Sequence, residues 1–173
     1  MLTLARPARP PALAGEVHVW RAARAEWPSS DDLLRAVLAG YLDTDPTAVE
    51  LRRGANGKPA LADHSRGPRF NLSHSADLAL IAVADREVGV DVERIRPRRS
   101  TDFYEGWARH EATVKCLGTG LSGRKPIPEP AVAVRMLDVE VGFVAALAVA
   151  GEEVPPVRLS AFEATHCGNH TKK

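Results

Sequence analysis

The sequence predicts an α+β fold made of two similar halves. Two stretches, near residues 33–42 and 103–117, repeat apolar residues at helical spacing, and several shorter stretches are continuously apolar or alternate like strands. Their order is strand, helix and strands, followed by helix and strands, which favours two α+β units packed together. With 173 residues the chain can form such halves. We place them at residues 1–96 and 97–164, and expect residues 165–173 to be a disordered tail.

In the first half, the alternating segment 16–22 predicts a strand, and the polar cluster 29–32 predicts the N-terminal cap of a helix ending near residues 43–46. A short strand is expected at 49–51, before the turn signal at 54–57. Further strands are expected from Phe70, over 78–84 and over 88–95. The turn at 85–87 predicts that the last two form a hairpin.

In the second half, Ser100 or Thr101 is expected to cap a helix that ends at Gly118 to Gly120. Its predicted apolar stripe consists of Phe103, Trp107, Val114 and Leu117. His110 lies within this stripe, which predicts that it is buried and neutral, and Glu111 and Lys115 lie at its edge. Strands are expected over 132–139, 142–150 and 157–162.

Composition and charge limit the classes of partner that we expect for the protein. The net charge of +1 gives no overall case for nucleic-acid or membrane binding, and no apolar run approaches the length of a membrane span. The two cysteines, Cys116 and Cys167, show no metal-binding spacing. The N-terminal segment lacks the apolar core of a signal peptide, so we expect a cytoplasmic protein.

Three carboxylates stand out as candidate ligands. Asp91 and Glu93 are two residues apart in a predicted strand, so both should point to one face, while Val90 and Val92 point to the other. Paired acids on one face repel each other unless a cation or proton lies between them. Glu111 adds a third carboxylate, with Lys115 one helical turn later. This set suits a hard divalent cation that also contacts a phosphate.

Four segments in order carry a family resemblance: Gly57-Lys58-Pro59, the segment Phe-Asn-Leu-Ser-His-Ser at 70–75, Gly-Val-Asp-Val-Glu at 89–93, and Trp107 to Lys115. Together they resemble the Sfp-type 4′-phosphopantetheinyl transferases over roughly residues 30 to 120. The run from Gly142 to Val149 is similar to the closing strand of that family. The resemblance implies the fold of these enzymes, a pseudo-dimer with the active site between its halves.

The resemblance also implies an activity, the Mg²⁺-dependent transfer of the phosphopantetheine arm of coenzyme A to a serine of an acyl or peptidyl carrier protein. Mg²⁺ would be held by Asp91, Glu93 and Glu111, and Glu111 would also accept the serine proton. The implied coenzyme A contacts are Lys58, Pro59, Ser73, His74, Lys115 and Arg35. For each of them an ordinary surface or turn role stays open, and for Arg35 it has equal weight. Asn71 is expected to be structural.

The chain departs from the family at three points. A basic segment before the first helix and an insertion between Arg99 and Phe103 are missing, and His110 occupies a catalytic-helix position where lysine is usual. Two alternatives therefore stay open: an enzyme of secondary metabolism on the same fold, such as a cyclase with His110 or His74 as acid or base, and a non-catalytic module that binds a carrier protein or coenzyme A. A homodimer also stays open, because a shortened pseudo-dimer can expose apolar surface.

Overall fold

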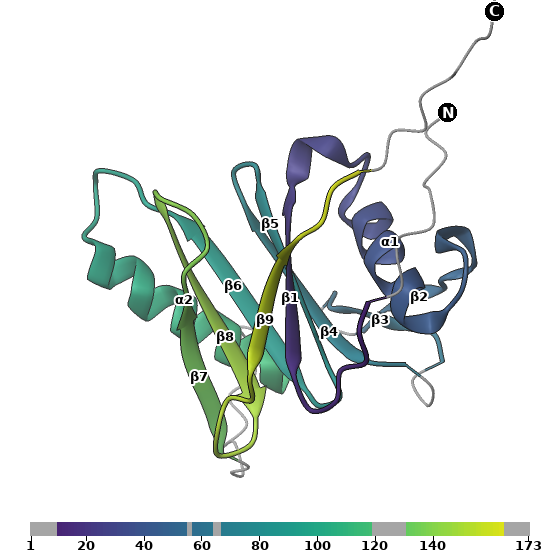
Figure 1. Cartoon of the computed structure of the whole chain (residues 1–173). Helices are drawn as coiled ribbons and strands as arrows, with labels where there is room; N and C mark the ends of the chain where they lie inside the picture. Colours follow the sequence, from purple (N-terminus) through teal and green to yellow (C-terminus); the bar gives the residue numbers. More distant parts are fainter. Residues whose placement is uncertain (1–9, 55–56, 64–66, 119–130, 165–173) are drawn as a thin grey trace, which may run out of the picture.

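The computed structural model describes residues 10–54, 57–63, 67–118 and 131–164. Its elements form four layers, with helix α1 (Ser30–Leu42), a four-stranded sheet, a three-stranded sheet and helix α2 (Thr101–Leu117) in that order (Figure 1). This arrangement confirms the predicted α+β class. The prediction of a pseudo-dimer divided near residue 97 stays a prediction.

The chain forms three strands of the first large sheet, then the whole second sheet, and returns to the first sheet with its last strand. The first has the order β4-β5-β1-β9, in which β9 runs parallel to β1, and the second has the order β6-β8-β7. Strands β2 and β3 pair separately as a small hairpin. The strand bounds are β1 Val17–Ala23, β2 Leu51–Arg53, β3 Pro59–Leu61, β4 Arg69–Ser75, β5 Leu78–Ala84, β6 Val88–Arg94, β7 Val132–Leu137, β8 Phe143–Ala150 and β9 Val157–Ala161.

Apolar side chains fill the three spaces between the layers. Helix α1 packs on β1 and β5 through leucines and valines such as Leu33, Leu34 and Leu38. Between the sheets, β1 and β5 face β6 and β8 across a valine-rich core. Because β5 is buried along its whole length and lies against both cores, it reads as a continuous apolar run without alternation.

The predicted hairpin of β5 and β6 is wrong. Both edges of β5 are occupied, by β4 on one side and β1 on the other, so no edge is left for β6. The turn at residues 85–87 instead carries the chain into the second sheet, where β6 pairs antiparallel with β8. The strand expected at 49–51 is shifted to Leu51–Arg53, because a 3-10 turn occupies Pro46–Ala48.

The predicted apolar stripe of α2 is also wrong. Phe103 and Trp107 are 42% and 43% exposed, whereas Ala108, Ala112 and Cys116 form the buried face. These small residues pack on Val144, Ala146 and Ala148 of the alanine-rich strand β8. Helix and sheet therefore approach each other closely, and Phe103 and Trp107 lie largely outside the contact, whereas Tyr104 packs against this cluster.

Side chains, in place of a backbone ladder, join β4 to β6. Each strand lies at the edge of its own sheet, so the edge N–H groups of β6 need acceptors from elsewhere. Alternate β4 side chains supply them: Asn71 Oδ1 accepts from Val90 N at 2.8 Å, Ser73 Oγ from Val92 N at 3.3 Å, and Ser75 Oγ from Arg94 N at 3.0 Å. We call these three contacts the β4–β6 seam.

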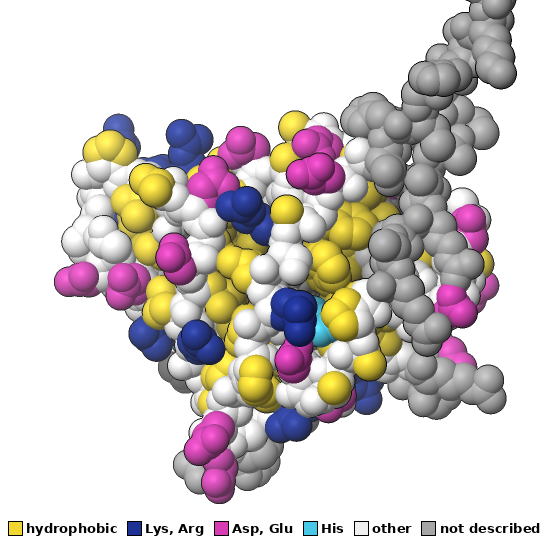
Figure 2. Space-filling view, in the orientation of Figure 1, with side chains coloured by type: hydrophobic (Ala, Val, Ile, Leu, Met, Phe, Trp, Pro, Cys, Tyr) yellow, Lys and Arg dark blue, Asp and Glu magenta, His cyan; other side chains and the backbone are white. Residues whose placement is uncertain are grey.

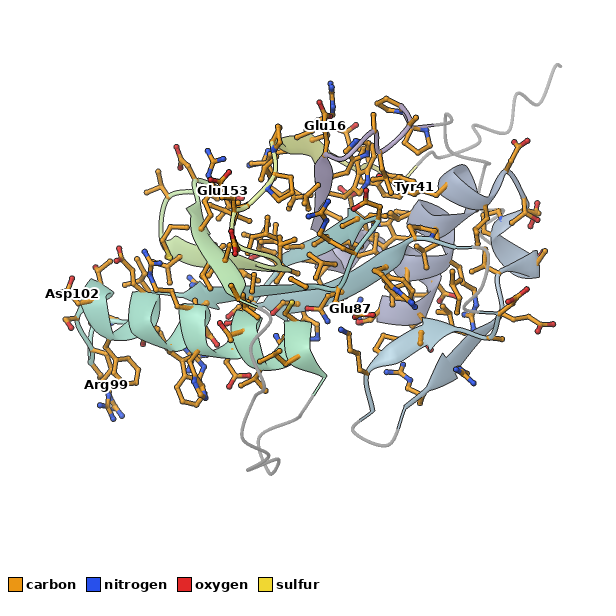
Figure 3. The ribbon with its side chains drawn as sticks, turned by 90° about the horizontal axis from the view of Figure 1, so that it is seen from below. Glu16, Tyr41, Glu87, Arg99, Asp102 and Glu153 are labelled. Atoms are coloured by element: carbon orange, nitrogen blue, oxygen red, sulfur yellow. The ribbon has the colours of Figure 1, made fainter. Side chains whose placement is uncertain are left out.

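His18 lies buried between β1 and α1, with 1% of its surface exposed. Tyr41 Oη accepts a hydrogen bond from Trp20 Nε1 at 2.8 Å and shares a second hydrogen bond with His18 Nδ1 at 2.7 Å. The other ring nitrogen, Nε2, faces Glu16 at 3.7 Å; Figure 3 labels Glu16 and Tyr41. Burial lowers the pKa of His18 below its usual 6.5, while Glu16 acts in the opposite direction.

The charged surface is mixed. Figure 2 shows Lys and Arg side chains interspersed with Asp and Glu over the face that carries β9, β8 and β7, as expected for a net charge of +1. Apolar side chains such as Leu159, 40% exposed, lie between them. Neither of the two described helices is long and apolar enough to cross a membrane.

Replacing Asn71 tests the seam. Asn71→Leu leaves the buried Val90 N–H without an acceptor and should lower the free energy of unfolding by about 1–3 kcal/mol. Ser75→Ala is the matched comparison, because Ser75 contacts Arg94 N where water can replace it. Urea unfolding measures both, and equal losses would contradict a buried acceptor role for Asn71.

Stability should fall with acidity because of His18. Its lowered pKa means that the unfolded chain binds the proton more readily. The stabilisation by neutral His18 is thus present above about pH 6.5 and is lost as pH falls through the folded-state pKa. His18→Phe should flatten this pH dependence of Tm. The control His74→Gln, at an exposed position, should keep the wild-type slope; an unchanged slope in His18→Phe would refute the assignment.

Candidate functional site

Residues from three separate segments meet at one point between β4, β6 and α2. Lys115 Nζ lies 2.6 Å from Asp91 Oδ1 and 3.1 Å from Ser73 Oγ, and Ser73 Oγ lies 2.9 Å from the same carboxylate oxygen. Asp91 is 3% exposed, and a carboxylate so buried needs a paired cation. Lys115 provides it, and also contacts the Val90 carbonyl at 3.4 Å.

Strand alternation places both predicted acids toward α2, while Val90 and Val92 face the core between the sheets. Asp91 contacts Lys115 of α2, and Glu93 accepts a hydrogen bond from Trp107 of α2. Gly89 continues the same face, and a Cβ there would collide with the backbone of Ala112 and Cys116. The predicted orientation of the acid pair is thereby confirmed.

The three carboxylates act on one another electrostatically. Burial, followed by the negative charges of Asp91 and Glu111, raises the pKa of Glu93, while Lys115 and the Trp107 hydrogen bond act against this. Asp91 Oδ2 and Glu111 Oε1 are both buried, and neither has a hydrogen-bond partner among the residues that the structure describes. Buried oxygens without a partner are costly, so this point of the structure would favour a bound cation or a donor.

The candidate ligands are carboxylate oxygens, which suit a hard divalent cation. Among the described residues, two of these oxygens have no hydrogen-bond partner. In the described parts of the chain, no group of three or more Asp, Glu, His or Cys side chains is already arranged to hold a metal ion. Asp91 Oδ1 is instead occupied by Lys115 and Ser73. Ions of the Mg²⁺ type keep several waters and bind through one or two carboxylates, so a complete protein cage is not required.

Ser73 is fully engaged by protein groups. Its hydroxyl donates to Asp91 Oδ1 and accepts from Val92 N and Lys115 Nζ. One donor and two lone pairs are all that a hydroxyl offers. In this structure, Ser73 therefore orients Asp91 and Lys115 and has no free group for a ligand.

Lys58 and Pro59 lie at the start of β3, beside a cavity of about 290 Å³ that is also lined by Arg69, Phe70 and Glu87. Lys58 Nζ donates to the carbonyl of Lys115 at 2.7 Å and lies 3.9 Å from Glu87. Burial lowers the pKa of Lys58. The Lys58 ammonium is therefore held at the C-terminal turn of α2.

The other predicted site residues lie apart from this cluster. His74 is exposed on β4, on the opposite face from Ser73. His110 is also exposed, with its ring 6.4 Å from that of Trp107, so the prediction that it is buried is wrong. The stripe that contained it is not the packed face of α2. Arg35 pairs with Asp32 at 3.5 Å beside a separate hollow.

The sequence did not lead us to predict the β4–β6 seam or the contact of Trp107 with Glu93. Asn71 is structural, as expected, but its task is specific: it lies within β4 and accepts a hydrogen bond from an edge N–H of β6. The signal was present, because Asn71, Ser73 and Ser75 alternate at one face of an extended segment. Trp107 was predicted as core, whereas it is half-exposed and donates to Glu93.

Sequence comparisons find known proteins that are similar to part of this chain. No protein-family model matches the chain. It is 32% identical over 119 residues to the 4′-phosphopantetheinyl transferase HetI of Nostoc, with 52% of this chain and 50% of the relative covered. It is 28% identical over 135 residues to the 4′-phosphopantetheinyl transferase of Bacillus subtilis, covering 62% and 57%.

A human relative, the L-aminoadipate-semialdehyde dehydrogenase-phosphopantetheinyl transferase, is 28% identical over 126 residues, covering 51% of this chain and 41% of its own. The chain thus spans about half the length of the curated relatives it matches. The chain is a relative of the 4′-phosphopantetheinyl transferases over that shared region.

Proposed function

We propose that the protein transfers the 4′-phosphopantetheine arm of coenzyme A to a serine of an acyl or peptidyl carrier protein. The observation that carries this proposal is the convergence of Ser73, Asp91 and Lys115, with Glu93 and Glu111 beside them. Relatives named phosphopantetheinyl transferase support it. We further propose a cytoplasmic setting, and a homodimer stays an open prediction.

In this proposal, Asp91, Glu93 and Glu111 hold Mg²⁺. The ion would supply positive charge to the pyrophosphate of coenzyme A as the transfer proceeds. Two orphaned carboxylate oxygens and the mutual repulsion of three acids support this placement. Asp91 would bind the ion through its unpartnered Oδ2, while Oδ1 keeps the Lys115 ammonium beside the reacting phosphate.

Glu111 is the proposed general base. Within the described parts of the chain its Oε1 has no hydrogen-bond partner, so it can accept the proton of the carrier serine directly or through one water. The serine oxygen forms a bond to the β-phosphorus, the bond from that phosphorus to the bridging oxygen breaks, and 3′,5′-ADP leaves with the electron pair. Lys115 would offset the charge that builds on the leaving phosphate. His74, exposed on β4, is proposed to donate a further hydrogen bond to a coenzyme A phosphate.

Intact mass spectrometry tests the activity. The protein with Mg²⁺, coenzyme A and apo carrier proteins should add one phosphopantetheine arm per carrier. Glu111→Gln should slow transfer about 10²–10⁴-fold, because it removes the base and keeps the shape. Asp91→Asn should also abolish most transfer, since it removes a ligand charge and the partner of Lys115.

Glu153→Gln is the matched control, since Glu153 is exposed in the loop after β8 (Figure 3), and it should transfer at the wild-type rate. Wild-type protein that is folded but adds no mass to any carrier would overturn the proposal. That outcome would favour the two alternatives, which separate readily: a cyclase-type enzyme turns over a small substrate without coenzyme A, whereas a binding module captures a carrier protein without transfer.

A further inference from the structure

Lys58 was expected from the sequence to contact a coenzyme A phosphate, but its surroundings indicate another task. We propose that Lys58 is a positioning residue, which holds the last turn of α2, and with it Lys115, against the start of β6. The effect on catalysis rests on the proposed function; the effect on the helix does not.

The shortest contact of Lys58 joins it to the end of α2. Nζ lies 2.7 Å from the carbonyl of Lys115, 3.5 Å from the carbonyl of Val88 and 3.9 Å from Glu87 Oε2. The first two oxygens accept hydrogen bonds from the ammonium, and Glu87 adds an ion pair. The side chain is only 25% exposed, so its strongest contact is directed to the helix end and away from solvent.

The Lys115 carbonyl lies in the last turn of α2. The last four carbonyls of an α-helix have no intrahelical donor, and a cation there also interacts favourably with the helix dipole. Helix α2 ends at Leu117, with Gly118 in the left-handed conformation at φ 66°. Lys58 therefore caps α2 from the start of β3, 57 residues earlier in the chain.

The same end of α2 is docked on β6 by two further features. Gly89 lacks a side chain where a Cβ would strike Ala112 and Cys116, and the Cys116 thiol contacts the carbonyl of Glu87 at 3.4 Å. Lys58 differs from these because it comes from outside the helix–strand pair. Figure 3 shows Glu87 at the junction of α2 with the β2–β3 hairpin.

Lys115 links this cap to the site. Its backbone carbonyl is held by Lys58, while its side chain reaches Asp91 at 2.6 Å and Ser73 at 3.1 Å. A shift of the last turn of α2 would therefore displace the ammonium at the site. Displacements of about 1 Å in a catalytic geometry can lower the rate about 10²-fold.

Lys58→Met tests this assignment, because methionine keeps much of the apolar stem and removes every donor. Amides in the last turn of α2 should exchange with deuterium about tenfold faster, since one capping hydrogen bond is lost. The kcat of transfer should fall about 10–100-fold, while KM for coenzyme A stays within about twofold. Lys58→Arg, which keeps donors and charge, should restore most of the protection and of kcat.

Arg52→Met is the matched control, because Arg52 is exposed on the same hairpin, and it should change neither quantity. A direct phosphate contact would give the opposite pattern, in which KM rises, kcat is kept and α2 exchanges at the wild-type rate; that result would overturn the proposal. If wild-type protein shows no transfer, the proposed function fails, but the exchange comparison of Lys58→Met with Arg52→Met still supports or refutes the cap.

Discussion

Side-chain acceptors of β4 join the two sheets of this protein, and the position of the site depends on them. An ordinary ladder between β4 and β6 would have merged the two sheets into one and directed β4 backbone groups at β6. Instead, Asn71, Ser73 and Ser75 reach across and satisfy the N–H groups of Val90, Val92 and Arg94. The sheets can then pack face to face while their edges stay in contact, and polar side chains are carried into the space where α2 arrives.

Ser73 belongs to both the seam and the site. It accepts from Val92 N as part of the seam and donates to Asp91 as part of the site. The buried Asp91 also needs Lys115, since breaking a buried ion pair by removing one partner typically costs about 3–5 kcal/mol. Strand β6, the β4–β6 seam and helix α2 are thus coupled through the carboxylate of Asp91. The same coupling explains why small residues form the contact face of α2, because a close helix is required for Lys115 to reach Asp91.

Alternation in the sequence was sufficient to predict the orientation of the acids, since a strand leaves only two choices. The helix stripe failed for a physical reason: hydrophobic periodicity is dominated by large side chains, whereas α2 packs through Ala108, Ala112 and Cys116. The β5–β6 hairpin failed because an apolar run shows that a strand is buried but does not show which strands flank it. The cap by Lys58 could not be predicted, because it joins positions 58 and 115, which only the fold brings together.

The excess of negative charge at the site links its geometry to the proposed reaction. Asp91 contacts the Lys115 ammonium, and within the described residues Asp91 Oδ2 and Glu111 Oε1 are buried without a hydrogen-bond partner. Repulsion from Asp91 and Glu111 adds to burial in raising the pKa of Glu93. A structural ion-pair network would be expected to satisfy these oxygens, because burying them unpaired destabilises the fold. Strain of this kind persists where a ligand relieves it. A divalent cation shared with a pyrophosphate would relieve the repulsion, with Lys115 beside the phosphate. Lys58 would keep the last turn of α2, and with it Lys115, in place.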